Sequence, residues 1–207
     1  SIFGVETDKF NNQITEKIRK FDKNLEVELK KIKLILDPFQ LKLQAKTIGT
    51  NLINQSKKIE IENIKIQFSL TTLIEDKFSI ENLEISSKSL ELKNLISFLR
   101  SFQNTPELFI MEKAIKKGYL IADIKLEFDT NGNIKNNSEI NGIVKDVELN
   151  VLKKYNLENL EFIFGYSKNN FLAKDINFKF NKIVFFSEKV SIKKKNDDFF
   201  CRWYLRS

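Results

Sequence analysis

The chain has 207 residues, enough for one domain, and 42% hydrophobic with 12% aromatic residues is not a disordered composition. Its formal charge is +7, yet Lys and Glu interleave at polar strand positions, as at Glu26, Glu28 and Lys30, which favours a solvated face over a nucleic-acid surface. One cysteine, Cys201, excludes an internal disulfide, and the lack of histidine removes the commonest general base and metal ligand.

The first predicted element is a helix over 7–21, within an N-terminal helical region 1–22. Phe10, Ile14 and Ile18 recur at helical spacing, and Thr7 suits the cap position. Its basic polar side is compatible with a membrane surface, but packing of the apolar stripe on a sheet is favoured. No apolar run reaches the ~18 residues of a membrane span, so any anchor or targeting segment would lie outside this sequence.

A first portion of sheet is predicted over 25–92. One strand covers 25–36, a turn follows at 37–38, and a second strand covers 39–45 with clean alternation of apolar residues. Two more strands lie within 59–85, separated by a short turn or helical turn at 69–74. Leu90 and Leu92 end a last extended piece before the helices.

Helices are predicted over 93–117. Leu95, Phe98, Leu99 and Phe102 form the stripe of the first helix. The run Thr105-Pro106-Glu107 opens the second with a capping threonine, a proline in the first position and an acid in the first turn. Gly118 is predicted to end this helix after a cluster of lysines.

A meander of strands is predicted over 119–207. The pair Asn131-Gly132 is the strongest short hairpin signal in the chain, and polar turns follow at 168–170 and 196–198. The pattern is still strand-like at Ser207. This indicates that the whole sequence, 1–207, is a single β-rich segment whose sheet continues in a longer chain.

A short phrase recurs among the strands: an apolar residue, any residue, a small polar or charged residue, then apolar–polar–apolar. Its copies begin at residues 29, 61, 80, 121, 144, 157 and 173. The apolar alternation changes phase at the central residue, and a β-bulge there would return the apolar side chains to the same face. A tight turn or a crossing between sheets would do the same, and short apolar phrases are also ordinary in all-β proteins. The irregular spacing excludes a fixed-period solenoid.

The sequence contains no recognisable catalytic constellation. It has no Gly-rich phosphate loop, no nucleophile motif and no spaced metal ligands. The adjacent carboxylates at 75–76 and 197–198 are interpreted as solvated turn residues. Trp203 and Tyr204 could stack on a base or a sugar, but packing in the core is favoured. We therefore expect no enzyme activity and no cofactor.

Two stretches of the sequence combine strand and turn patterns in a distinctive order. The first is the strand at 64–70 with Ser69-Leu70 and Leu73, followed by the strand phrase at 78–85. The second begins at 115–126, where a helix leads through Lys-Lys-Gly-Tyr into a strand, and continues at 128–132 and 140–144. These motifs are diffuse apolar patterns that extend over most of the chain, and they resemble the AsmA-like family of Gram-negative bacteria, which includes AsmA, TamB and YhdP.

The resemblance implies a periplasmic protein anchored in the inner membrane, with a repeating β-groove whose interior is apolar. It implies a part in moving phospholipid between inner and outer membrane, as in bridge-like lipid transfer proteins, and in outer-membrane biogenesis. The expected fold is mainly β with a few helices (α+β). A long twisted, mostly antiparallel sheet forms a groove, with the N-terminal amphipathic helix and helices near 93–117.

Fourteen apolar strand residues are candidates to line this groove and contact phospholipid acyl chains. Each has the competing interpretation of an ordinary core position beneath the helices. They are Ile64, Ile66, Phe68, Leu83, Ile85, Ile124, Leu126, Phe128, Leu160, Phe162, Phe164, Ile176, Phe178 and Phe180.

Two other functions remain open from the sequence. A periplasmic scaffold or assembly factor for outer-membrane proteins would bind its partners through sheet edges. A nucleic-acid-binding β-protein is suggested only by the charge, and we expect no nucleic-acid partner.

Overall fold

The computed structural model describes residues 3–6, 23–29, 31–37, 39, 42–69, 80–129, 133–151, 154–195 and 198–204. The predicted helix at 7–21 lies outside these ranges. So do the acidic pair at 75–76, most of the predicted turn at 69–74, and the hairpin pair Asn131-Gly132. The helical region predicted over 1–22 is wrong at Phe3–Glu6, which form a strand.

The described residues form thirteen strands and two helices. The fold is therefore mainly β, as predicted, and its sheet is open and antiparallel. The bounds are β1 Phe3–Glu6, β2 Leu25–Glu28, β3 Lys31–Asp37, β4 Lys42–Asn54, β5 Lys57–Ser69, β6 Ile80–Ser87, β7 Leu90–Glu91, α3 Leu92–Arg100, α4 Pro106–Ala114, β8 Ile115–Glu127, β9 Glu139–Val151, β10 Tyr155–Ser167, β11 Asn170–Phe180, β12 Ile183–Lys195 and β13 Asp198–Tyr204.

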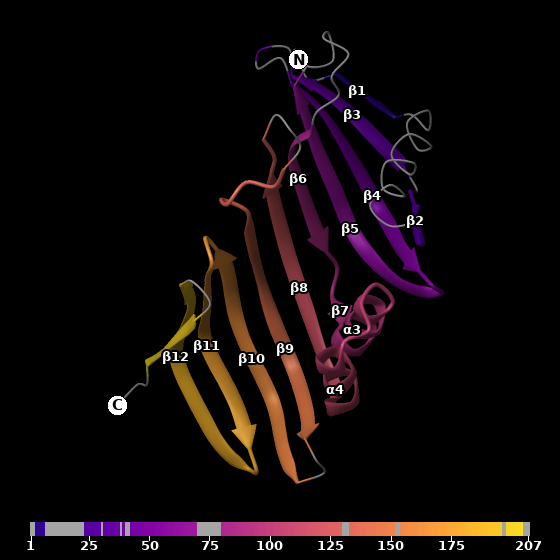
Figure 1. Ribbon diagram of the computed structural model, residues 1–207. Helices are drawn as coiled ribbons and strands as arrows, with labels where there is room; N and C mark the ends of the chain where they lie inside the picture. The colour runs from indigo at the N-terminus through magenta and orange to yellow at the C-terminus, as the bar shows by residue number, and fades with distance from the viewer. Residues whose placement is uncertain are drawn as a thin grey trace. The chain divides into compact units, whose positions relative to one another are not determined.

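The chain forms two compact units. Unit 1 comprises Ser1–Lys88 and Asp123–Ser138, and unit 2 comprises Ser89–Ala122 and Glu139–Ser207. In unit 1 the strand order is β1-β3-β4-β5-β6-β8, with β2 also paired to β4 (Figure 1). In unit 2 the order is β8-β9-β10-β11-β12-β13, with β7 also paired to β8. Strand β8 contributes residues to both units.

The long strands of unit 1 begin from a tight hairpin. Gln55 and Ser56 connect β4 to β5, and both have left-handed backbone angles, with φ of 47° and 67°. Two such residues match the right-handed twist of the strands that they join. Strand β5 pairs in turn with β6, which confirms that the two strands predicted within 59–85 exist and are neighbours in the sheet.

Two boundaries predicted for unit 1 are wrong. The strand predicted over 25–36 is split into β2 and β3, which both pair with β4. Phe39, predicted to begin the next strand, lies in the turn and is 91% exposed. Its N–H donates to the Asp37 carboxylate at 3.0 Å, so an aspartate-stabilised turn replaces the first strand residues, and β4 begins at Lys42.

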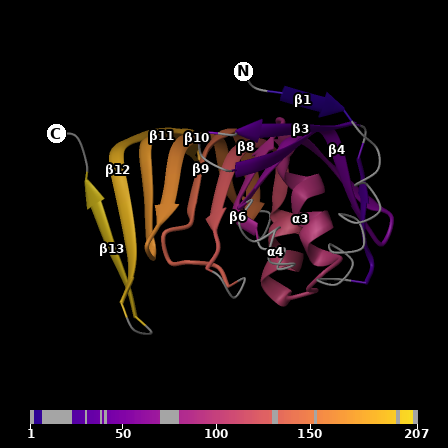
Figure 2. The same cartoon turned by 90° about the horizontal axis from the view of Figure 1, so that it is seen from above.

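The two predicted helices are present and lie side by side (Figure 2). The Thr105 hydroxyl accepts from the Leu108 N–H at 3.4 Å, which confirms the predicted cap of α4. A backbone hydrogen bond, and then one to Thr105, lower the pKa of Glu107 in the first turn. Arg100 of α3 forms an ion pair with Glu112 of α4.

Two details around the helices differ from the prediction. Leu92 is the first residue of α3 and not the end of a strand. Helix α4 ends at Ala114, and Gly118 lies inside β8 with φ of +142°. A Cβ atom on Gly118 would lie 2.9 Å from side-chain atoms of Leu92 and Val147. The glycine therefore allows close packing within unit 2 and does not stop the helix.

Unit 2 contains the predicted meander. Two-residue turns at 168–169 and 181–182 connect β10 to β11 and β11 to β12, and all four turn residues have positive φ. Val190 lies opposite Trp203, and Ile192 lies opposite Cys201. Trp203 is 55% exposed and Tyr204 is 40% exposed, so the predicted packing of these two residues in the core is wrong.

The recurring phrase has a distinct backbone in unit 2. Its central residues Asp146, Asn159 and Asp175 have φ of 52°, 51° and 52°, in the neighbouring strands β9, β10 and β11. Around Asn159 the register of β10 shifts relative to both of its neighbours, β9 and β11. These three residues, which we call the seam, confirm the predicted bulge at these copies of the phrase.

Candidate functional site: the apolar sheet faces

In unit 1 the predicted lining residues lie in rows across the strands. Ile64 lies opposite Ile85, which lies opposite Ile124. In the next row Leu83 lies between Ile66 and Leu126. Directly opposed residues of an antiparallel pair point to the same face, so these side chains share one side of the sheet. Phe128 lies just beyond β8, in an isolated bridge with Ile134.

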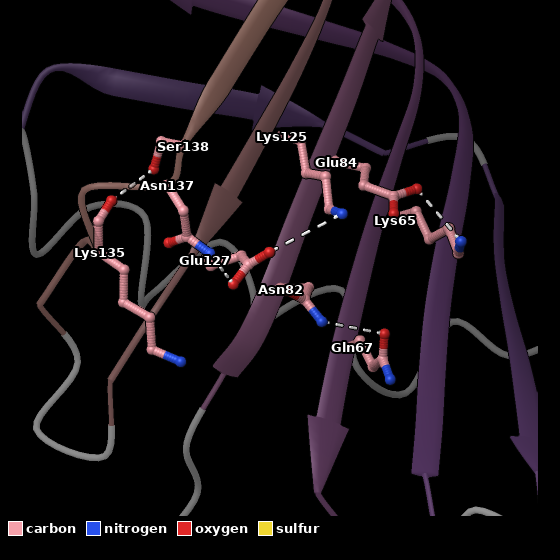
Figure 3. Close-up of polar contacts among 9 residues, drawn as sticks. All are labelled: Lys65, Gln67, Asn82, Glu84, Lys125, Glu127, Lys135, Asn137 and Ser138. Atoms are coloured by element: carbon pink, nitrogen blue, oxygen red, sulfur yellow. Dashed lines mark hydrogen bonds and ion pairs between the residues drawn. The ribbon is translucent and has the colours of Figure 1, made fainter. Parts of the chain in front are cut away.

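The opposite face of unit 1 is polar. Lys65 forms an ion pair with Glu84 at 3.2 Å, and the Asn82 amide donates to the Gln67 side-chain oxygen at 3.2 Å (Figure 3). The next strand continues this face with the ion pair of Lys125 and Glu127, at 3.8 Å. The sheet therefore has one apolar and one charged side, as the alternation in the sequence predicts.

Strand β4 interrupts the apolar face of unit 1 with buried polar residues. The Thr47 and Thr50 hydroxyls lie 2.7 Å apart, and the Thr47 hydroxyl also accepts from the Ile64 N–H at 3.2 Å. Asn54 is completely buried, and neither polar atom of its side chain has a hydrogen-bond partner in the structure. Ile64, Ile66 and Phe68 are themselves buried, at 5–8% exposure. The other predicted lining residues of unit 1, on β6 and β8 and just beyond β8, are partly exposed. Only the part of this face on β4 and β5 therefore has the character of a closed core.

Unit 2 has an apolar face that extends over β9 to β13, with the buried Ser187 opposite Ile176 as a polar residue on it. Leu157 lies between Leu149 and Phe180, Leu160 lies opposite Val147, and Phe162 lies opposite Val144. We call these residues and their same-side neighbours on β11 to β13 the aromatic face. Its members are Val144, Val147, Leu149, Tyr155, Leu157, Leu160, Phe162, Phe164, Phe171, Ala173, Ile176, Phe178, Phe180, Ile183, Phe185, Val190, Ile192, Cys201 and Trp203.

Aromatic rings on this face contact one another across the strands. Phe178 stacks on Phe185 with 5.1 Å between the ring centroids, and Phe164 stacks on Phe171 at 6.0 Å. Tyr155 stacks on Phe180, also at 6.0 Å. Contacts of this kind link β10, β11 and β12 into one apolar layer.

The seam keeps the aromatic face on one side of the sheet. Ala173 and Ile176 are both buried although they are three residues apart, and the left-handed Asp175 lies between them. Val144 and Val147 flank Asp146 in the same way. A regular strand would send one residue of each pair to the opposite face of the sheet, so the bulge supplies the missing phase change.

Much of the aromatic face is open to solvent. The six predicted lining residues of this unit include one buried residue, Ile176, while the other five are partly exposed. Ile183 is 63% exposed and Phe185 is 41% exposed. Helix α4 contacts β9. An apolar layer of this size and exposure is a typical feature of a binding surface.

The fourteen predicted lining residues leave out the part of the aromatic face on β12 and β13. Ile183 and Phe185 alternate along β12, and after a phase change Val190 and Ile192 alternate again. The change was not recognised because β12 has no copy of the phrase. The pairing of β11 with β12 places the phase change of β12 next to the seam residue Asp175.

Two further features are absent from the described residues. They contain no group of three or more His, Cys, Asp or Glu side chains that could hold a metal ion. None of the helices in this part of the chain is long and apolar enough to cross a bilayer. Comparison of the chain with protein-family models, curated proteins and solved structures finds no match.

Proposed function

We propose that this chain is a non-enzymatic lipid-handling module of a cell envelope, and that its aromatic face contacts the acyl chains of phospholipids. One observation carries the proposal: rows of apolar side chains cross β9 to β13 on one side of the sheet, and several of them are partly exposed. Acyl chains require a continuous apolar surface and make no specific polar contacts, and this face has that composition.

The remaining parts of the proposal rest on the sequence resemblance to AsmA-like proteins. On that basis the module works in the periplasm, in a chain anchored to the inner membrane, and supports phospholipid movement and outer-membrane biogenesis. The aromatic face then forms part of a groove along which acyl chains pass.

The test is native mass spectrometry with lipid extraction, performed on the protein purified from a bacterial host. We expect stoichiometric phospholipid. The variant Phe162→Glu/Phe178→Glu places two carboxylates on the aromatic face and should lose the lipid, because a charge in an acyl-chain contact is costly.

A matched control places the same charges on the other face of the same strands. Ile163 is 48% exposed on β10, and Asn177 is exposed on β11. The variant Ile163→Glu/Asn177→Glu should keep its lipid. A lipid-free wild-type protein would overturn the proposal, and so would equal loss of lipid from both double variants when circular dichroism shows both folded.

A further inference from the structure

The last three strands of unit 2 have two chemically different faces. On one side Val190 lies opposite Trp203 and Ile192 opposite Cys201, as part of the aromatic face. On the other side Lys189 lies opposite Tyr204, and Lys193 lies opposite Phe200. Strand β13 ends the strand order of unit 2, so no described strand covers its outer edge (Figure 2).

The second side is a cationic patch formed by Lys174, Lys189, Lys193 and Arg202. Lys174 lies opposite Lys189, and Arg202 lies opposite Ser191 between the two lysines of β12. The other residues of these rows are Asn170, Leu172, Ser191, Phe200 and Tyr204, and none of them is acidic. Within these three rows the positive charges have no carboxylate among them, unlike the mixed polar face of unit 1. The next row in the register pairs Lys195 with Asp198, and Glu188 precedes Lys189 in β12, so acidic residues border the patch.

The charges lie close together. The Lys189 ammonium is 5.4 Å from the centre of the Tyr204 ring. A hydrogen bond with Arg202 lowers the pKa of the Tyr204 hydroxyl; burial opposes this effect, and the charges of Arg202, Lys189 and Lys193 reinforce it. An anionic partner would relieve the mutual repulsion of these cations.

Exposed rings accompany the cations on both sides of β13. Phe200 is 58% exposed and Tyr204 is 40% exposed on the cationic side, while Trp203 is 55% exposed on the apolar side. A nucleic acid stacked on a sheet uses the rings of one face, and the other face is then core. Aromatic rings around both faces of an edge, next to lysines, are typical of the headgroup zone of a bilayer.

We propose that the β12–β13 edge of unit 2 docks on an anionic lipid surface, with the cationic patch against the phosphate headgroups and Trp203 at the border of the hydrocarbon. This inference goes beyond the proposed function and does not depend on it, because a sheet that carries no acyl chains can still dock in this way.

The chain supplies its own probe, since Trp203 is its only tryptophan. The experiment adds vesicles of phosphatidylcholine, with or without phosphatidylglycerol, to the whole 207-residue protein and records tryptophan emission together with co-sedimentation. We expect co-sedimentation and a blue shift of Trp203 only with the anionic vesicles. Both should weaken as salt increases, because headgroup attraction is screened.

The variant Lys189→Gln/Lys193→Gln/Arg202→Gln removes three charges of the patch. It should weaken partitioning onto anionic vesicles about 100-fold, since each basic residue near the surface contributes roughly one factor of five. The control Lys57→Gln/Lys93→Gln/Lys116→Gln removes the same net charge from exposed positions elsewhere and should bind nearly as the wild type does. Thermal unfolding checks that both variants remain folded.

Three results would overturn the proposal. The first is equal binding to neutral and anionic vesicles, and the second is equal weakening by the two triple variants. The third is tight binding of a labelled single-stranded oligonucleotide that releases the protein from vesicles, which would assign the patch to nucleic acid. The Phe162→Glu/Phe178→Glu variant separates the two proposals, because it should lose its acyl chains and still dock through the β12–β13 edge.

Discussion

The two units build the same two-faced sheet from similar sequence phrases, but the apolar face differs in exposure. In unit 1, Ile64, Ile66 and Phe68 of β5 are buried next to the buried threonines and asparagine of β4, whereas the predicted lining residues of β6 and β8 are partly exposed. In unit 2, the equivalent rows carry stacked phenylalanines, and Ile183 and Phe185 are exposed. Alternation alone therefore does not predict which part of an apolar face is buried and which part is exposed.

The phrase itself also behaves differently in the two units. Asp146, Asn159 and Asp175 of unit 2 are left-handed, whereas Asn63 and Asn82 of unit 1 are not. In unit 1 the phase change of β4 falls at Gly49, with φ of 66°, and the register between β5 and β6 shifts between Ile61 and Asn63. The two units therefore change the phase of the apolar alternation by different backbone conformations. Only unit 2 uses left-handed asparagine and aspartate residues on neighbouring strands.

The largest difference between the units should appear when their apolar faces are truncated. Ile66→Ala removes a buried side chain and should lower the free energy of unfolding by about 3 kcal/mol. Phe178→Ala removes a larger side chain that is only partly buried, and should cost about half as much. Urea unfolding measures both. A larger cost for Phe178→Ala would mean that the aromatic face is a core and not a binding surface.

A second contrast lies within unit 2 and tests how tightly its strands approach. A Cβ on Gly142 would lie 2.4 Å from the Ile121 carbonyl oxygen and 2.7 Å from the ring of Phe164. Since backbone has to move, Gly142→Ala should cost about 2 kcal/mol in urea unfolding.

Gly165 is the matched control, because its Cβ would meet only the end of the Asn141 side chain, at 2.9 Å. That side chain can rotate away, so Gly165→Ala should change stability by less than about 0.5 kcal/mol. Equal costs for the two variants would contradict the close approach of β9 to its neighbours.

The sequence alone predicts the mainly β fold, the two central helices and the rows of apolar residues, because strand alternation and helix punctuation are local signals. It fails where tertiary context decides. The alternation predicts a strand at Phe39, but its N–H donates to the Asp37 carboxylate and the residue lies in a turn. Gly118 is predicted to end a helix, but it lies in a strand where Leu92 and Val147 leave no room for a side chain.

The candidate site was only half predictable for a related reason. Thirteen of its fourteen residues lie on strands and Phe128 lies just beyond β8, but alternation carries no information on which of them stay exposed. The cationic patch was also missed, since its lysines are separated by up to nineteen positions, from Lys174 to Lys193, and only the register brings them together. Function for both surfaces remains a proposal that the vesicle and lipid-extraction experiments test.

The smallest and most specific contrast concerns the seam. At Asn159 of unit 2, with φ of 51°, glycine should be better than alanine by about 1 kcal/mol, because a Cβ disfavours left-handed angles. At Asn63 of unit 1, an extended position, alanine should be better than glycine by roughly 0.5 kcal/mol, because glycine loses more freedom on folding. Thermal unfolding of the four variants gives the two differences with opposite sign, independently of what the asparagine side chain contributes. The same sign at both positions would mean that the phrase has one backbone solution, and that the seam does not distinguish the units.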